Sequence, residues 1–417
     1  MPDPAILTPA NEAELGDILA SACADRRPVE VVGGGSKTGI GRPQRLAQKI
    51  STAQLAGVVD YDPAELVLTV RAGEPLAAIE ALLAQSNQML AFEPFDFGPI
   101  FGHAAGASTI GGVVAAGIAG SRRLSAGNVR DHVLGFTAVS GAGQSFKAGG
   151  RVVKNVTGYD VSKLMTGSWG RLAVMTQMTL KVMPRPRTTL TLALRGLSLA
   201  EGASALARAL RSQADPAAAA FTPGSETPES KTPESKTPGS KTPGSEGLTV
   251  IRLEGSGPSI EARARLLGDL LADAGAVDRL DQGEAQRLWA SVRDGSWLGQ
   301  GASEGGSDDV LWRISAPLSA GGGVAEALAV LGGRSLLDWG GALVWALAPA
   351  GATSQIRSIA ESAGGHAMMV RAPSAVRKLT PALHPETPGV TALSARVKAA
   401  LDPHAILDPQ RFREAAQ

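Results

Sequence analysis

The residues best suited to chemistry form a glycine-rich run that follows a short apolar strand, residues 28–32. Successive glycines let a backbone approach an anion closely, and they allow several N–H groups to point at one place, as in a phosphate-binding nest. Two hydroxyl side chains add further donors. The run predicts a phosphate-binding loop, with an ordinary glycine-rich turn as the alternative. The residues expected to contact phosphate are Gly33, Gly34, Gly35, Ser36, Lys37 and Thr38.

This run differs from two common phosphate-binding motifs. A P-loop requires Gly-Lys-Ser/Thr in that order, and the run lacks it. A dinucleotide-binding fingerprint opens a long helix, whereas Arg42-Pro43 follows this run and breaks a helix. A phosphate bound here would therefore sit in a different kind of loop.

A second cluster, between positions 109 and 120, is dominated by glycine and alanine and predicts a thin helix over residues 109–119. The N-terminus of such a helix offers free N–H groups and a positive dipole end to a pyrophosphate. Tight packing of the helix on a sheet is the alternative. The candidate contacts are Thr109, Ile110, Gly111, Gly112 and Gly120.

A third cluster, between positions 149 and 170, places polar side chains among apolar ones. Lys154 is suited to stabilise a developing negative charge on a ring or an oxyanion, and Asn155 follows it directly. Asp160 precedes a short apolar segment, and we interpret it as the N-cap of a helix.

The composition excludes several classes of protein. The 417 residues carry 40 basic and 39 acidic side chains, so nothing points to a nucleic-acid partner or an anionic membrane. Cys23 is the sole cysteine of the sequence, which excludes an intrachain disulfide and an iron–sulfur cluster ligated by this chain alone. His366, His384 and His404 are dispersed, so we predict no metal site.

The sequence also bears on location. Asp3 and the absence of a basic segment near it argue against a secretory signal. The longest stretch without charge, residues 97–121, contains seven glycines and His103, which favours a buried loop and helix over a membrane span. We expect a cytoplasmic protein, with peripheral attachment to the inner face of the membrane through a complex as the alternative.

The elements that must position these clusters alternate along the chain and predict an α+β fold with two domains. Asn11 is placed as the N-cap of a helix over residues 11–26, and a helix is expected over 74–84. A second region has an antiparallel or mixed sheet. The predicted divisions are a cofactor domain over 1–187, a smaller α+β domain over 188–400, and a C-terminal segment over 401–417.

A low-complexity insertion interrupts the second domain between residues 215 and 247. Its repeat of Thr, Pro, Ser, Lys, Glu and Gly has no large apolar residue, so it cannot bury enough surface to offset the entropy of ordering. We predict a disordered surface insertion, with a functional tether as the alternative.

Taken in order, the three clusters resemble the FAD-binding domain shared by the vanillyl-alcohol oxidase and p-cresol methylhydroxylase superfamily. The matching segments are the glycine-rich run 33–41, the Thr-Ile-Gly-Gly sequence at 109–112, and the segment 158–170 that leads into a strand ending near Pro184. Residues 401–409 are similar to the closing segment of that superfamily, which returns to the FAD domain.

The resemblance narrows to the family of the E subunit of bacterial glycolate oxidase. It is carried by residues 120–131 and 149–160, and in the second domain by Trp289, Trp312-Arg313 and 338–342. It covers nearly the whole chain except the insertion. Two departures are Gly35, where members with covalent flavin often carry histidine, and Gly170-Arg171-Leu172-Ala173 in place of Gly-Thr-Leu-Gly.

The resemblance implies a PCMH-type FAD-binding domain of two subdomains, followed by a cap domain, and FAD held without a covalent bond. The glycine-rich run and residues 109–112 would hold the pyrophosphate, so a carboxylate placed at Gly34 would repel it. The backbone around Leu172 and Val174 would line the flavin or the adenine. Lys154 and Asn155, the candidate catalytic residues, would steady the reduced flavin or tune its potential.

The resemblance also implies partners: a larger FAD-containing sister subunit, an iron–sulfur subunit, and a small 2-hydroxy acid, glycolate, that the complex oxidises to glyoxylate. In the first hypothesis this chain binds FAD and relays electrons or supports assembly. In the second it is a self-sufficient FAD oxidoreductase in which Arg293, Arg313 or Lys154 meets a substrate carboxylate. The third is a scaffold that has lost its flavin.

Overall fold

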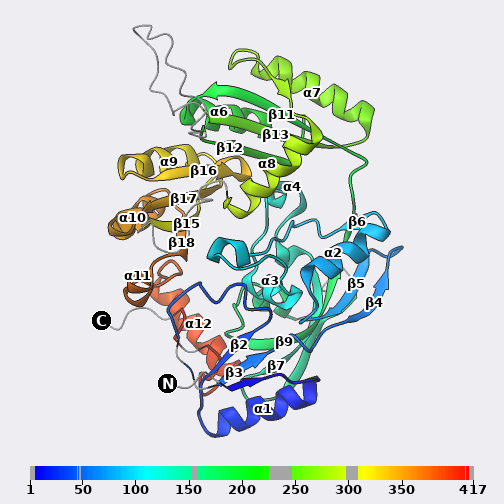
Figure 1. Cartoon of the computed structure of the whole chain (residues 1–417), viewed down its shortest axis with the longest axis vertical. Coiled ribbons are helices and arrows are strands. Elements are labelled where there is room, and N and C mark those ends of the chain that lie inside the picture. The colour runs from blue at the N-terminus through cyan, green and yellow to red at the C-terminus, as the bar shows by residue number, and fades with distance from the viewer. Residues whose placement is uncertain are drawn as a thin grey trace. The chain divides into compact units, whose positions relative to one another are not determined.

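A computed structural model describes residues 5–44, 46, 48–151, 158–224, 247–296, 309–408 and 410–412. The chain divides into two compact units, which we describe separately (Figure 1). Unit 1 comprises Met1–Gly120, Ala126–Arg185 and Ser374–Gln417, and unit 2 comprises Ser121–Ser125 and Pro186–Pro373. Unit 1 thus takes up the C-terminal part of the chain from position 374, earlier than the predicted return at 401. The functional domain boundaries stay a prediction.

Unit 1 is built on two main sheets. The five-stranded sheet is antiparallel in the order β4 (Val58–Asp62), β5 (Val67–Arg71), β9 (Ala173–Lys181), β7 (Val133–Ser140), β8 (Ser145–Gly149). The three-stranded sheet is parallel in the order β1 (Ala5–Leu7), β3 (Gln48–Ser51), β2 (Val29–Val32). The short strands β6 (Gln88–Met89) and β10 (Met183–Pro184) also pair. A turn around Gly141–Gly143 joins β7 to β8 in an antiparallel hairpin.

Helices cover these sheets because their apolar faces need burial. Their bounds are α1 (Glu12–Ala24), α2 (Leu76–Gln85), α3 (Ile110–Ala116), α5 (Val161–Met165), α11 (Ser374–Leu379) and α12 (Pro388–Leu401), and α4 (Arg123–Ala126) begins in unit 2. Two predicted caps are confirmed: Asn11 accepts a hydrogen bond from the N–H of Glu14 at 2.9 Å, and Asp160 accepts one from the N–H of Lys163 at 3.2 Å. The helix α3 ends earlier than predicted because Gly117 takes a left-handed conformation at its C-cap.

Unit 1 has two cores. One lies between α2, α3 and the five-stranded sheet, and the other between α1 and the parallel sheet. Leu407 is fully buried in the second core, and residues 406–408 lie alongside β2: the N–H of Val29 donates to the carbonyl of Ile406 at 2.9 Å. The C-terminal segment thus extends the parallel sheet at the strand that leads into the glycine-rich run.

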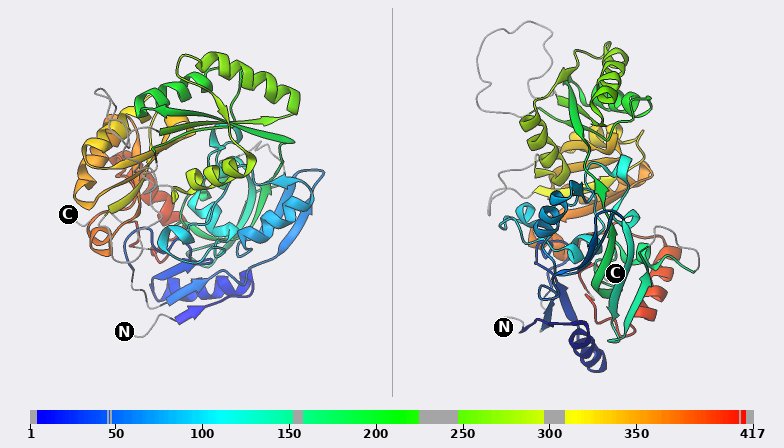
Figure 2. Two further views of the ribbon diagram at one scale, coloured as in Figure 1. Left: turned by 45° about the horizontal axis from the view of Figure 1, so that its top comes forward. Right: turned by 90° about the vertical axis from the view of Figure 1, so that its right-hand side faces the viewer.

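Unit 2 is built on an eight-stranded sheet in which every paired strand is antiparallel. Its order is β14 (Asp278–Arg279), β11 (Thr188–Leu197), β13 (Gly247–Gly255), β12 (Ala218–Thr222), β16 (Arg334–Asp338), β17 (Leu343–Pro349), β15 (Asp309–Ser315), β18 (His366–Arg371). The helices that pack on it are α6 (Leu199–Leu210), α7 (Gly257–Leu271), α8 (Gln282–Asp294), α9 (Gly321–Val330) and α10 (Thr353–Ser362). Figure 2 shows the strong twist of this sheet.

Two elements of unit 2 correct the sequence-based expectations. The insertion predicted from residue 215 begins too early, because Ala218–Thr222 form β12, a fully buried strand between β13 and β16. Residues 225–246, the rest of the predicted insertion, lie outside the described residues. The helix α8 had no counterpart among the predicted helices. It buries Trp289, whose indole N–H donates to Thr191 at 3.0 Å.

Candidate cofactor site

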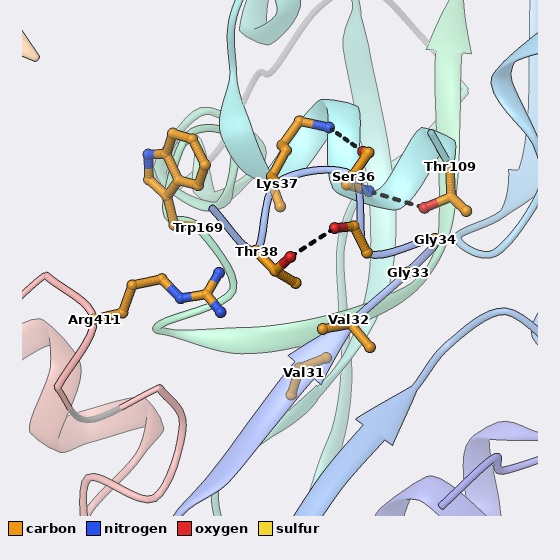
Figure 3. Close-up of a pocket in the computed structure, with 13 residues that line it drawn as sticks. Val31, Val32, Gly33, Gly34, Ser36, Lys37, Thr38, Thr109, Trp169 and Arg411 are labelled. Atoms are coloured by element: carbon orange, nitrogen blue, oxygen red, sulfur yellow. Dashed lines mark hydrogen bonds between the residues drawn. The ribbon is translucent and has the colours of Figure 1, made fainter. Parts of the chain in front are cut away.

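A cavity in unit 1 lies where β2 ends and the glycine-rich run begins (Figure 3). Segments far apart in the sequence meet there: the run itself, the start of α3, and two side chains from later in the chain. The residues that line the cavity are Val31, Val32, Gly33, Gly34, Gly35, Ser36, Lys37, Thr38, Thr109, Gly112, Ala115, Trp169 and Arg411.

Two glycines allow the run to pack against the chain before α3. A Cβ atom on Gly34 would lie 1.5 Å from the carbonyl oxygen of Ala107, and one on Gly33 would lie 2.2 Å from the hydroxyl oxygen of Thr109. Neither position tolerates a side chain. Gly35 differs, because it has open space around its missing Cβ and a φ of +75°. The glycines therefore serve the loop's packing as well as its approach to a ligand.

The turn leaves backbone N–H groups without acceptors in residues that line the cavity. The N–H and the hydroxyl of Thr38 both bond to the carbonyl of Gly35, at 3.2 and 3.0 Å. Within the described part of the chain, the N–H groups of Gly34, Gly35 and Ser36 have no hydrogen-bond acceptor. Orphan N–H groups beside a cavity are the donors that a phosphate nest uses.

A line of polar side chains supports the run from behind. The ammonium of Lys37 lies 3.5 Å from the hydroxyl of Ser36, which lies 3.1 Å from the hydroxyl of Ser108. Ser108 donates to the carboxylate of Asp96 at 2.9 Å. Since that bond uses the Ser108 proton, Ser36 donates to Ser108. The four side chains then form one donor chain that runs from Lys37 to Asp96.

The two charged ends of this donor chain, Lys37 and Asp96, both have a lowered pKa, but for different reasons. Burial lowers the pKa of Lys37 to about 8, and the attraction of Asp96 offsets only part of that effect. Burial works against the charge of Asp96, but hydrogen bonds from the N–H groups of Gly98 and Gly106 and from Ser108, together with Lys37, hold its pKa below the usual value. Lys37 is thus a desolvated cation at the cavity wall, which an anionic ligand would stabilise.

The start of α3 offers fewer donors than its sequence suggested. The N–H of Ile110 donates to the carbonyl of Glu74 at 3.0 Å, and that of Gly111 donates to Ala72 at 2.8 Å. The N–H of Gly112 makes a long bond, 3.4 Å, to the side chain of Thr109, the N-cap. Thr109 and Gly112 line the cavity, whereas Ile110 and Gly111 pack behind it.

Arg411 reaches the cavity from the C-terminal segment, and its position had no local sequence signal. It pairs with Glu30 on β2 and lies 3.3 Å from Asp408, and its carbonyl accepts the N–H of Arg42 at 2.9 Å. A nearby arginine, Arg377 of α11, donates to the carbonyl of Gly41 at 2.7 Å. The C-terminal segment therefore contacts the chain where the glycine-rich run ends, at Gly41 and Arg42. A basic residue after the closing motif, with an acidic partner on β2, was the signal that could have revealed it.

Of the other sequence-predicted site residues, three are described and two are not. Lys154 and Asn155 fall outside the described residues. Val174 is buried in the core against α1, Leu172 packs on the main core, and the N–H of Gly120 donates to the carbonyl of Phe92. None of these three lines the cavity. Their assigned roles stay predictions.

Among the described residues, no group of three or more His, Cys, Asp or Glu side chains is arranged to hold a metal ion. Across the same residues, no helix has the length and apolar character needed to cross a membrane.

Residues 3–149 match the protein family described as FAD binding domain. Over 346 residues the chain is 38% identical to glycolate oxidase subunit GlcE of Escherichia coli, and the match covers 83% of each chain. The chain belongs to the GlcE family. It is an FAD-dependent oxidoreductase, and its cofactor is FAD.

Two further proteins are similar to the chain, one in sequence and one in fold. The chain is 30% identical over 193 residues to glycolate oxidase subunit GlcD of Bacillus subtilis, which covers 46% of this chain and 39% of that one. The crystal structure of p-cresol methylhydroxylase with substrate bound has a TM-score of 0.66 at 14% identity, covering 98% of this chain and 88% of that one. The PCMH-type fold predicted for this GlcE homologue is therefore confirmed, as is its resemblance to the family.

The donors that line the cavity suit the pyrophosphate of FAD. The orphan N–H groups of the cavity, the desolvated ammonium of Lys37 and the guanidinium of Arg411 are all donors, as the pyrophosphate of FAD requires. Gly35 leaves open space where a side chain would otherwise stand. The donor set fits an anion, and the sequence-predicted pyrophosphate role of the run stays the best interpretation of it.

Proposed function

We propose that this GlcE homologue is the FAD-binding subunit of a multi-subunit glycolate oxidase that oxidises glycolate to glyoxylate. The observation that carries the proposal is the 38% identity to Escherichia coli GlcE over 83% of both chains. The second match, to a subunit named GlcD, supports a larger sister flavoprotein as partner. The proposal includes the iron–sulfur subunit that the family resemblance implies. Its clusters would be ligated by that other polypeptide, because the sequence of this chain has a single cysteine, Cys23.

FAD supplies a two-electron acceptor for the oxidation of an alcohol. The residues of this chain bind and orient it: N–H groups of Gly34, Gly35 and Ser36 and the charges of Lys37 and Arg411 would hold the pyrophosphate. Lys154 and Asn155 remain the proposed polar groups near the flavin. We further propose that the flavin is not covalently attached, because Gly35 carries no nucleophile.

The alternative within the same class is a self-sufficient oxidoreductase of a 2-hydroxy acid. The observation in its favour is Arg313 of β15, a guanidinium held largely away from water in unit 2. A location at the inner face of the cell membrane through the complex stays part of the proposal.

Anaerobic addition of glycolate to the purified chain, with and without the sister flavoprotein, tests the proposal. The visible flavin bands of this chain should persist with glycolate alone and bleach when the sister subunit is added. Bleaching by glycolate alone would support the self-sufficient alternative. Bands that persist in both mixtures, with an active sister subunit, would contradict a role in glycolate oxidation.

A further inference from the structure

Unit 1 has a second cavity, formed by α12, the loop before it and the C-terminal segment. Its volume is about 460 Å³, against about 80 Å³ for the first cavity, the one at the glycine-rich run. Among its lining residues are Arg171, Leu383, Lys398, Asp408 and Phe412. Pockets for organic ligands commonly have volumes of about 300–1,000 Å³. The second cavity therefore has room for a ring system, whereas the first has the size of a phosphate group.

Two contacts show that the cavities are neighbours. Trp169 lines the first cavity and Phe412 the second, and their ring centres are 5.2 Å apart with an angle of 49° between the planes. Arg411 lines the first cavity, and its Nε lies 3.3 Å from the carboxylate of Asp408, which lines the second. The guanidinium carbon of Arg171 lies 5.9 Å from the Phe412 ring centre. An aromatic pair and an ion pair thus form the wall between the cavities.

The backbone at Trp169 is strained. Its φ is +58°, a conformation that bulky residues rarely adopt. Two hydrogen bonds to α3 hold it there: the N–H of Trp169 donates to the carbonyl of Ala115 at 2.8 Å, and the N–H of Gly167 donates to that of Val114 at 3.1 Å. Strain that the surroundings maintain in this way is typical of binding sites.

The indole of Trp169 is accessible to a ligand. Trp169 is only partly buried, whereas Phe412 behind it is 6% exposed. Figure 3 shows the indole on the side of the glycine-rich run opposite Thr109, where Lys37 and Arg411 also lie. An indole in this position offers an aromatic surface next to the cations that suit a phosphate group.

We propose that Trp169 stacks on a heteroaromatic ring of FAD, at the point where the cofactor extends from the first cavity into the second. The proposal rests on the proposed function in one point, that the pyrophosphate lies on the glycine-rich run. FAD carries a ring system at each end, adenine and isoalloxazine, and both have the planar face that stacks on an indole. The larger cavity supplies the space that such a ring needs.

Titration of the flavin-free full chain with FAD, followed by flavin fluorescence, tests the stacking. Trp169→Leu keeps an apolar side chain without a ring, and Trp169→Phe keeps a ring. The matched control is Phe146→Leu, because Phe146 is a partly buried aromatic residue of the same unit that pairs with Phe136 at 5.7 Å and lines neither cavity. Three competitors of FAD divide the ligand: inorganic pyrophosphate has no ring, and ADP and FMN carry one ring system each.

We expect Trp169→Leu to weaken FAD binding by about tenfold or more, Trp169→Phe by less than about threefold, and Phe146→Leu not at all. Pyrophosphate should bind to all four chains equally. The competitor that carries the stacked ring should lose affinity for Trp169→Leu, and the other should not. If that ring is adenine, ADP should also quench the emission of Trp169, the sole tryptophan in the sequence of unit 1.

Three results would overturn the stacking: unchanged FAD affinity of Trp169→Leu, a Phe variant as weak as the Leu variant, or an equal loss of affinity for pyrophosphate, ADP and FMN. The last result would mean that Trp169 only shapes the phosphate loop. If Trp169→Leu does not fold, Trp169→Asn replaces it, because asparagine accepts a positive φ.

The glycolate experiment stands apart from this test. A chain that loses FAD affinity in Trp169→Leu, but is never reduced with glycolate and the sister subunit, contradicts the proposed function and leaves the stacking intact. A chain that is reduced, but whose Trp169→Leu variant binds FAD as tightly as the wild type, contradicts the stacking alone.

Discussion

At the scale of single residues, Lys37 gives the cavity a dependence on pH. Its pKa in the free chain is about 8, and a pyrophosphate beside it would raise that value. Below about pH 7 the ammonium is charged with or without flavin, so affinity should be constant there. As pH rises through the free-chain pKa, binding must restore the lost proton. The affinity for FAD should then fall by up to about tenfold per pH unit.

Titration of the flavin-free chain with FAD between about pH 7 and about pH 9, followed by flavin fluorescence, measures this profile. Lys37→Met should bind more weakly at neutral pH and lose the slope. Lys163→Met is the matched control, because Lys163 is exposed on α5 and pairs with Asp160. A wild-type profile without slope would remove Lys37 from the phosphate site.

Single residues also show where sequence reasoning succeeds. The N-caps Asn11 and Asp160 were predictable because a cap depends on residues within one turn of the chain. The sequence indicated that position 34 requires glycine, but it did not show why. A side chain on Gly34 would collide with the carbonyl oxygen of Ala107. A charge placed there would disrupt the loop before it repelled a phosphate, so Gly34→Asp does not test the phosphate role.

At the scale of elements, the buried carboxylate of Asp402 is a main anchor of the C-terminal segment. Asp402 is 1% exposed and accepts the N–H groups of Ile406 and Leu407 at 3.0 and 2.9 Å. Lys398 of α12 lies 2.6 Å from the same carboxylate and donates to the carbonyl of Arg171 at 2.6 Å. This arrangement keeps the segment on β2, and with it Arg411 at the cavity.

Asp402→Ala should therefore lower the free energy of unfolding by about 3–5 kcal/mol, because it leaves a partly buried ammonium and two N–H groups without their acceptor. It should also weaken FAD binding through the displaced Arg411. Urea unfolding and flavin content measure the two effects. Asp25→Ala, at an exposed pair with Arg27, should cost about 1 kcal/mol or less. A loss at Asp402 no larger than at Asp25 would refute the role of this ion pair.

Two elements also show where sequence patterns fail to predict secondary structure. Most helices and strands follow apolar periodicity, which is a local property. The strand β12 did not stand out, because its run of alanines adjoins the low-complexity insertion and becomes a strand only between β13 and β16. The helix α8 is mostly polar, and it is recognisable only from the indole of Trp289 packed on β11.

At the scale of the whole molecule, the order of the glycine clusters was enough to predict the fold. Each cluster marks a place where backbone must approach backbone or ligand, and such constraints leave a trace in the sequence. The pairing of Arg411 with Glu30 joins residues from distant parts of the chain. Charges of this kind become sites only after folding, so sequence patterns alone did not place them.

Flavin content of the chain purified alone, compared with that of Gly112→Ala, tests the central claim that this cavity holds FAD. A Cβ on Gly112 would make ordinary contacts, 3.5 Å from Thr109 and 3.7 Å from the ammonium of Lys37. Alanine in a helix is favoured over glycine by about 0.5–1 kcal/mol, so the variant should be at least as stable. The added methyl group nonetheless occupies the cavity wall.

We predict that the wild-type chain carries a stoichiometric amount of FAD, released on denaturation, and that Gly112→Ala retains much less of it with an undiminished free energy of unfolding. A colourless wild-type chain, or a Gly112→Ala variant with full flavin content, would contradict the account.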